Sequence, residues 1–83
     1  MLTIKVLGPG CANCKRLEAI ARKAASDANI EAQFVKVTDT NEILAYNILS
    51  TPGLVINEKL MSSGRIPSPG AITGWLKEAA AGA

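Results

Sequence analysis

The chain has 83 residues, enough for one small domain, and 48% of them are hydrophobic. Nine basic and seven acidic residues leave a net charge of +2, which argues against a dedicated nucleic-acid binder, since those proteins usually carry a strongly basic face. The absence of histidine excludes Ser–His–Asp and Cys–His catalysis and every zinc site that needs an imidazole ligand.

The first apolar stretch, Met1 to Leu7, is short, contains Lys5 and has no basic region ahead of it, so we expect neither a targeting segment nor a membrane span there. A signal peptide needs about 7–15 apolar residues after a basic start, and a membrane span needs about 18. We therefore expect a cytoplasmic protein with no membrane insertion. In that compartment a close cysteine pair is more often redox-active or metal-binding than structural.

The first half of the chain predicts a strand, a helix and a strand. Residues 2–7 are rich in strand formers and end at the Gly-Pro-Gly of residues 8–10. A helix is expected from about residue 11 to residue 28, because its apolar residues recur at spacings of three and four. Residues 32–37 form the second predicted strand. Such a unit has parallel strands and a right-handed crossover.

Two helix starts are visible in the second half. Asp39 followed by Glu42 is an N-cap signature for a helix over residues 41–49. Ser68 followed by Pro69 is the signature of a last helix, because serine caps well and proline suits the first helical position. The core-facing residues expected in that last helix are Ile72, Trp75, Leu76 and Ala79.

A hairpin is expected between these two helices. Residues 54–56 and 59–61 are apolar runs separated by Asn57-Glu58, a spacing typical of a tight antiparallel turn. The order β-α-β-α-β-β-α therefore predicts one α/β domain over residues 1–83. Its four-stranded mixed sheet would carry helices on both faces, with the first strand in a central position.

Cys11 and Cys14 are the residues that indicate chemistry. Cys11 lies where the glycine-rich turn meets the helix, so unpaired N–H groups and the helix dipole should lower its pKa below the usual value of about 8.5. Cys14 lies on the same helical face, within reach of Cys11. The pair predicts thiol–disulfide exchange, in which Cys11 attacks a disulfide and Cys14 resolves the mixed disulfide.

Other interpretations of the pair remain open. A CxxC is also half of a zinc site, although only carboxylates or a second subunit are available as further ligands. Two thiolates suit Cu(I), so a soft-metal binding module is the alternative function. Two unreactive thiols, or an inactive adaptor that binds partners near Thr51-Pro52, are further options. Lys5, in the middle of the first strand, either extends to solvent or acts on the thiolate.

Three segments together resemble a known family. They are Gly8-Pro9-Gly10-Cys11-Ala12-Asn13-Cys14, Thr51-Pro52-Gly53-Leu54-Val55-Ile56-Asn57 and Ser63-Gly64-Arg65-Ile66-Pro67-Ser68. In order and spacing they resemble the small thioredoxin-like, glutaredoxin-like redox-active disulfide proteins of archaea and bacteria. The resemblance implies the minimal thioredoxin fold and thiol–disulfide oxidoreductase activity. It implies Cys11 as nucleophile, Cys14 as resolving thiol, no metal, and no cofactor beyond the Cys11–Cys14 disulfide.

The same resemblance implies how substrates bind. It implies that the Thr51–Pro52 peptide bond is cis and faces the disulfide, and that substrates contact Thr51, Pro52, Gly10, Gly64 and Arg65. The implied partners are a disulfide reductase such as thioredoxin reductase and disulfide-containing client proteins. Nucleic acid is not expected as a partner, and the protein is expected to be a monomer.

Overall fold

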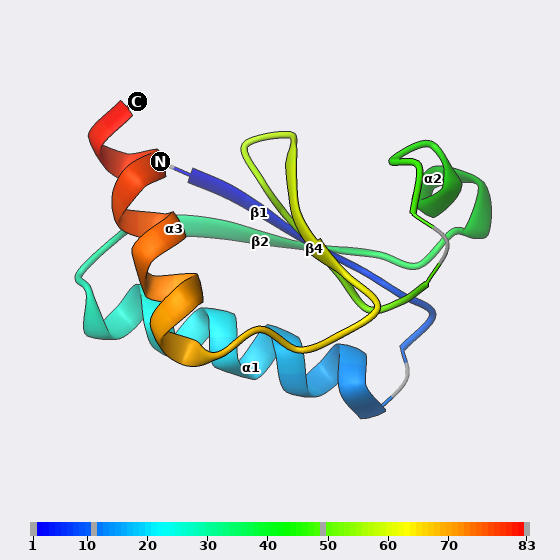
Figure 1. Ribbon diagram of the computed structural model, residues 1–83, viewed down its shortest axis with the longest axis horizontal. Helices are drawn as coiled ribbons and strands as arrows, with labels where there is room; N and C mark the ends of the chain where they lie inside the picture. Colours follow the sequence, from blue (N-terminus) through cyan, green and yellow to red (C-terminus); the bar gives the residue numbers. More distant parts are fainter. Residues whose placement is uncertain (1, 11, 49, 83) are drawn as a thin grey trace.

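The computed structural model describes residues 2–10, 12–48 and 50–82. A four-stranded sheet carries three helices, in the predicted element order (Figure 1). Strand order in the sheet is β2-β1-β3-β4, with β1 parallel to β2 and antiparallel to β3, so the central position expected for the first strand is confirmed. The elements are β1 (Leu2–Leu7), α1 (Ala12–Asp27), β2 (Ala32–Val37), α2 (Thr40–Leu44), β3 (Gly53–Ile56), β4 (Lys59–Ser63) and α3 (Pro69–Gly82).

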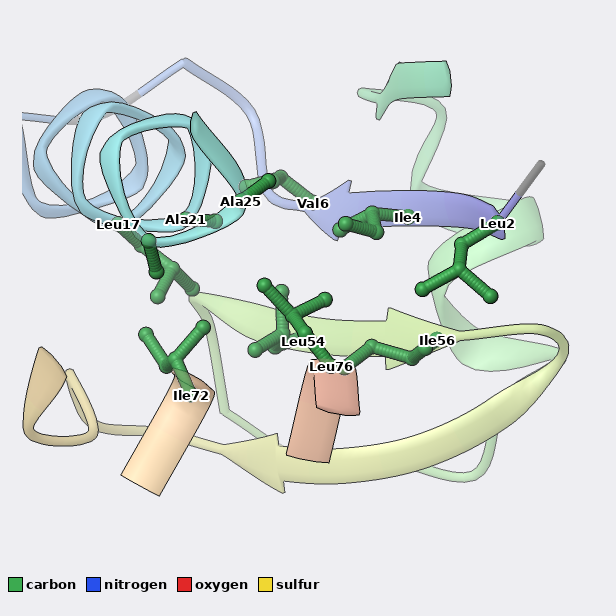
Figure 2. Close-up of a cluster of buried hydrophobic side chains, with 11 residues drawn as sticks. Leu2, Ile4, Val6, Leu17, Ala21, Ala25, Leu54, Ile56, Ile72 and Leu76 are labelled. Carbon is green, nitrogen blue, oxygen red and sulfur yellow. The ribbon is translucent and has the colours of Figure 1, made fainter. Parts of the chain in front are cut away.

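The larger core lies between the sheet and the pair α1 and α3, which cross the same face (Figure 1). Strand residues alternate between the two faces of a sheet, so every second residue of β1 points to this core. Leucine, isoleucine and valine side chains of β1 and β3 there meet apolar residues of both helices, as Figure 2 shows. The buried members are Leu2, Ile4, Val6, Leu17, Ala21, Ala24, Ala25, Leu54, Ile56, Ile72 and Leu76, each at most 4% exposed.

A smaller core covers part of the opposite face. It consists of Leu7, Val37, Ile43, Ile48 and Val55. In the described part of the chain, the short α2 covers this core with Ile43, and the segment after α2 covers it with Ile48. The prediction of helices on both faces is confirmed, with two helices on one face and one on the other.

Helix α2 is shorter than predicted. It spans Thr40–Leu44 rather than residues 41–49, and residues 45–47 form a turn. Asn47 adopts a left-handed backbone with φ of 62°, and its N–H is donated to the Leu44 carbonyl, which closes the helix. The predicted cap is confirmed, because the Asp39 carboxylate accepts the Asn41 N–H at 2.9 Å. Residue 49 lies outside the described residues.

The β3–β4 hairpin is longer than predicted. Its turn residues Asn57 and Glu58 have φ values of 50° and 67°, the conformation of a primed two-residue turn whose twist matches that of the strands. Strand β4 continues two residues beyond the predicted end, because Ser62 and Ser63 pair with the start of β3. This extension brings the residues after β4 back to the beginning of β3.

Helix α3 begins as predicted. The Ser68 hydroxyl accepts the Ala71 N–H at 3.2 Å, and Pro69 is the first helical residue. Helices α1 and α3 have 16 and 14 residues. Within residues 2–10, 12–48 and 50–82, no helix combines the length and apolar character needed to cross a bilayer.

Candidate active site

Cys14 lies in the first turn of α1 and is buried, with 5% of its surface exposed. It is a disulfide-bonded cysteine. A disulfide can accept two electrons from thiols by exchange, so a bonded cysteine at this place could take part in such a reaction. Cys11 lies outside the described residues, and its role as nucleophile stays a prediction.

The end of β1 passes directly beneath the Cys14 sulfur. A Cβ placed on Gly8 would collide with Cys14 Sγ and would lie 3.8 Å from the Cβ of Thr51. The Gly8 backbone is anchored from the other side, because its N–H is donated to the Val37 carbonyl at 2.9 Å. Cys14 and Thr51 are 37 positions apart in sequence, and both lie next to the Gly8 backbone.

The loop before β3 forms the neighbouring wall. The Thr51–Pro52 peptide bond is cis, the isomer that the resemblance implies. Pro52 is buried and Thr51 is exposed. The Gly64 N–H, just after β4, is donated to the Pro52 carbonyl at 2.9 Å, which ties the end of the hairpin to this loop. Gly64 has a φ of 75°, which favours glycine. Arg65 follows it as an exposed residue.

The residues predicted for the site thus fall into two contacting groups. Gly10 lines a cavity together with Cys14, while Pro52 and Gly64 are joined by a hydrogen bond. Thr51 connects the two groups through Gly8. Arg65 is exposed and directly follows Gly64, so its place in the chain puts it at the margin of this assembly.

The cavity beside Cys14 has a volume of about 40 Å³ and a charged wall that the sequence did not reveal. Glu18, Lys15 and Lys36 line it, Glu18 and Cys14 being one helical turn apart on α1. The Glu18 carboxylate accepts from Arg22 Nε at 2.8 Å and pairs with Lys36 Nζ at 3.2 Å. The Arg22 hydrogen bond and the Lys36 ammonium hold the pKa of Glu18 below its ordinary value.

A local sequence signal exists for only part of this wall. Glu18 and Arg22 are four residues apart, the spacing at which helical ion pairs form, and the Arg22 guanidinium also lies over the Phe34 ring, 4.6 Å from its centroid. The contribution of Lys36 depends on how β2 lies beside α1, and no sequence spacing carries that information. The sequence shows only that Lys36 lies near the carboxyl end of the strand that follows the helix, which does not by itself indicate a contact with Glu18.

Lys5 lies away from this site. Alternation along β1 directs it to the opposite face of the sheet from Val6, which lines the cavity at Cys14. There it forms an ion pair with Glu58 and donates to the Tyr46 hydroxyl at 2.9 Å, and these contacts raise the pKa of Lys5. The suggestion that Lys5 acts on the thiolate is therefore replaced by a structural ion pair.

The described part of the chain holds no group of three or more histidine, cysteine, aspartate or glutamate side chains placed to bind a metal ion. The charged wall of the cavity contains one carboxylate whose two oxygens are already engaged by cations.

Comparison with known proteins agrees with this geometry. Residues 2–77 match the family described as thioredoxin domain. The chain is 38% identical over 68 residues to a thioredoxin of Methanothermobacter thermautotrophicus, covering 82% of this chain and 88% of the relative. It is 36% identical over 77 residues to a thioredoxin of Methanocaldococcus jannaschii, covering 93% and 88%.

Solved structures show the same fold at low identity. Mitochondrial thioredoxin 3 of Saccharomyces cerevisiae, in its oxidised form, superposes with a TM-score of 0.66 at 16% identity, covering 93% of this chain and 77% of that one. Oxidised thioredoxin of Plasmodium falciparum gives a TM-score of 0.56 at 18% identity, covering 93% and 79%.

Proposed function

Because this chain belongs to the thioredoxin family and is a thiol–disulfide oxidoreductase, we propose that it exchanges electrons with protein disulfides through Cys11 and Cys14. Cys11 is the nucleophile and Cys14 the resolving thiol. The observation that carries the proposal is the disulfide-bonded state of Cys14, buried at the start of α1 and next to Gly8 and Thr51. In this proposal Cys11, the other cysteine of the sequence, is its disulfide partner.

The reaction takes place in two exchange steps. The Cys11 thiolate attacks one sulfur of the client disulfide, the client S–S bond breaks, and one client thiolate leaves. Cys14 then loses its proton and attacks Cys11, which breaks the mixed disulfide and releases the second client thiolate. The client gains two electrons and, at neutral pH, two protons, and the protein is left with the Cys11–Cys14 disulfide.

The burial of Cys14 supports its assignment as the resolving thiol. Cys14 is 5% exposed and packs against Gly8, so a folded client cannot bring a disulfide sulfur in line with it. An attack from within the same molecule needs no such access. This difference supports Cys14 as the resolving thiol and leaves the first attack to Cys11.

We assign client binding to the surface around Thr51. Thr51 is exposed beside the Gly8–Cys14 contact, so an extended client segment can lie along its backbone as an added strand. Pro52, Gly64 and Gly10 shape this surface, and Arg65 lies at its margin. A disulfide reductase such as thioredoxin reductase would return two electrons to the Cys11–Cys14 disulfide in the cytoplasm.

Single-cysteine variants test the assignment. Reduction of insulin disulfides by Cys11→Ser should be abolished, since the attacking sulfur is missing. Cys14→Ser should stop after the first step and accumulate a mixed disulfide with the client, visible as a mass increase that dithiothreitol removes. Ala19→Ser, which adds a hydroxyl to an exposed position of α1, is the matched control and should retain activity.

Two results would contradict the assignment. Mixed disulfide accumulating on Cys11→Ser rather than Cys14→Ser would reverse the two roles. Stoichiometric, tight Cu(I) binding by the reduced protein, together with no insulin reduction by the wild type, would favour the soft-metal alternative.

A further inference from the structure

We propose that Gly8 is a positioning residue that controls the stability of the Cys14 disulfide, because its missing side chain provides the space that the bonded sulfur occupies. This inference deepens the proposed function. It rests on that function in one respect, namely that the disulfide of Cys14 is the Cys11–Cys14 disulfide that reacts with clients. Gly8 lies outside the Cys-Ala-Asn-Cys segment, at the end of β1.

The contact at Gly8 leaves no alternative place for a side chain. A Cβ built there collides with Cys14 Sγ and stands 3.3 Å from Cys14 Cβ. On a third side is Thr51, whose Cβ would lie 3.8 Å away. The Gly8 backbone cannot easily withdraw, because its N–H is bonded to the Val37 carbonyl of the neighbouring strand. The collision must therefore be relieved by movement of the sulfur.

Backbone conformation does not explain the glycine. Gly10 and Gly64 have φ values of 93° and 75°, in the region that favours glycine, whereas Gly8 is not among the residues with positive φ. An alanine could adopt the Gly8 backbone without strain. Space for the sulfur is thus what the position requires.

The cost of filling that space differs between the two redox states. In the oxidised protein the sulfur is held by its covalent bond, so the Cys14 side chain cannot rotate away. In the reduced protein the thiol can move to another staggered rotamer. A Cβ at position 8 therefore disfavours the disulfide form more than the dithiol form, and the protein becomes a stronger oxidant.

The test is a redox titration of Gly8→Ala. Wild type and variant are equilibrated with mixtures of reduced and oxidised dithiothreitol, trapped with an alkylating reagent and quantified by mass. We expect the equilibrium constant for disulfide formation to fall at least tenfold, which corresponds to a rise of about 30 mV in midpoint potential. Gly70→Ala, where an added Cβ meets nothing within 4 Å, should leave it unchanged.

Unfolding experiments on the oxidised and the reduced protein distinguish a general loss of stability from a specific effect on the disulfide form. Gly8→Ala should raise the unfolding equilibrium constant more in the oxidised than in the reduced protein, by the same factor that the titration gives. An unchanged midpoint potential, or equal losses in both states, would overturn the proposal. If Gly8→Ala does not fold, adding Cys14→Ala should restore folding, because the colliding sulfur is gone; failure to do so would also overturn it.

The outcome is independent of client reduction. A potential shift in a protein that reduces no client would support the role of Gly8 and contradict the proposed function. Normal insulin reduction by the wild type, together with an unchanged midpoint potential in Gly8→Ala, would support the proposed function and contradict the role of Gly8.

Discussion

Glu18→Gln removes the one carboxylate among the described residues that line the cavity at Cys14, while keeping the size of the side chain. The carboxylate is 15% exposed and bound by Arg22 at 2.8 Å and Lys36 at 3.2 Å. An i,i+4 helical pair contributes about 0.3–0.5 kcal/mol and an exposed pair up to about 1 kcal/mol. Since the Lys36 and Arg22 ends are solvated, we expect Glu18→Gln to lower the free energy of unfolding by about 1 kcal/mol at pH 7.

The pH dependence of this loss has a defined sign. The pKa of Glu18 is lower in the folded protein than its ordinary value of 4.5, so the folded state prefers the ionised form. The stabilisation is therefore complete above about pH 5 and disappears as the pH falls through the lowered pKa. Urea unfolding of wild type and variant between pH 7 and pH 2.5 should show a stability difference that decreases toward zero in acid.

The same substitution has an electrostatic effect on the reduced site. Without Glu18 the cations Lys15 and Lys36 line the cavity unopposed, which favours the Cys14 thiolate over the thiol. Alkylation of Cys14 is compared in Cys11→Ser and in the double variant Cys11→Ser/Glu18→Gln. The pH at which the alkylation rate reaches half of its maximum should be lower in the double variant. Alkylation across a pH series gives the midpoint directly.

Glu31→Gln is the matched control, since Glu31 is exposed at the opposite end of β2 from the cavity. It should change neither the stability difference nor the alkylation midpoint. The reasoning is refuted if Glu18→Gln loses the same free energy at pH 2.5 as at pH 7. It is equally refuted if the Cys14 midpoint moves upward or stays in place.

Two further predictions concern stability. Leu54 is fully buried between the sheet and helices α1 and α3, so Leu54→Ala should cost about 2–5 kcal/mol, and a denaturation loss below 1 kcal/mol would mean that this core is not close-packed. Gly74→Ala, in α3 with open space around the added Cβ, should raise the free energy of unfolding by about 0.5–1 kcal/mol through better helix propensity; a loss in thermal or urea unfolding would contradict the helix described there.

The element order was predictable because each element carries its own local signal. The N-caps Asp39 and Ser68 place helix starts through hydrogen bonds made within three residues, and the strands have a two-residue alternation. The end of α2 was predicted wrongly because its local signal is weak. Asn47 has a left-handed backbone just after the helix. Asparagine can adopt this conformation but also occurs inside helices, so its presence in the sequence does not fix the helix end.

Sequence alone predicted the architecture and the kind of reaction. The β-α-β-α-β-β-α order predicted the mixed sheet that the structure has, and two cysteines before a predicted helix, with no histidine, predicted the thiol–disulfide exchange that the thioredoxin relatives support. Tertiary structure decided what surrounds Cys14. Gly8, Thr51 and Lys36 approach the site only after β1, the loop before β3 and the end of β2 have come together. Residues distant in the chain have no spacing rule, because their contacts depend on how whole elements pack against one another.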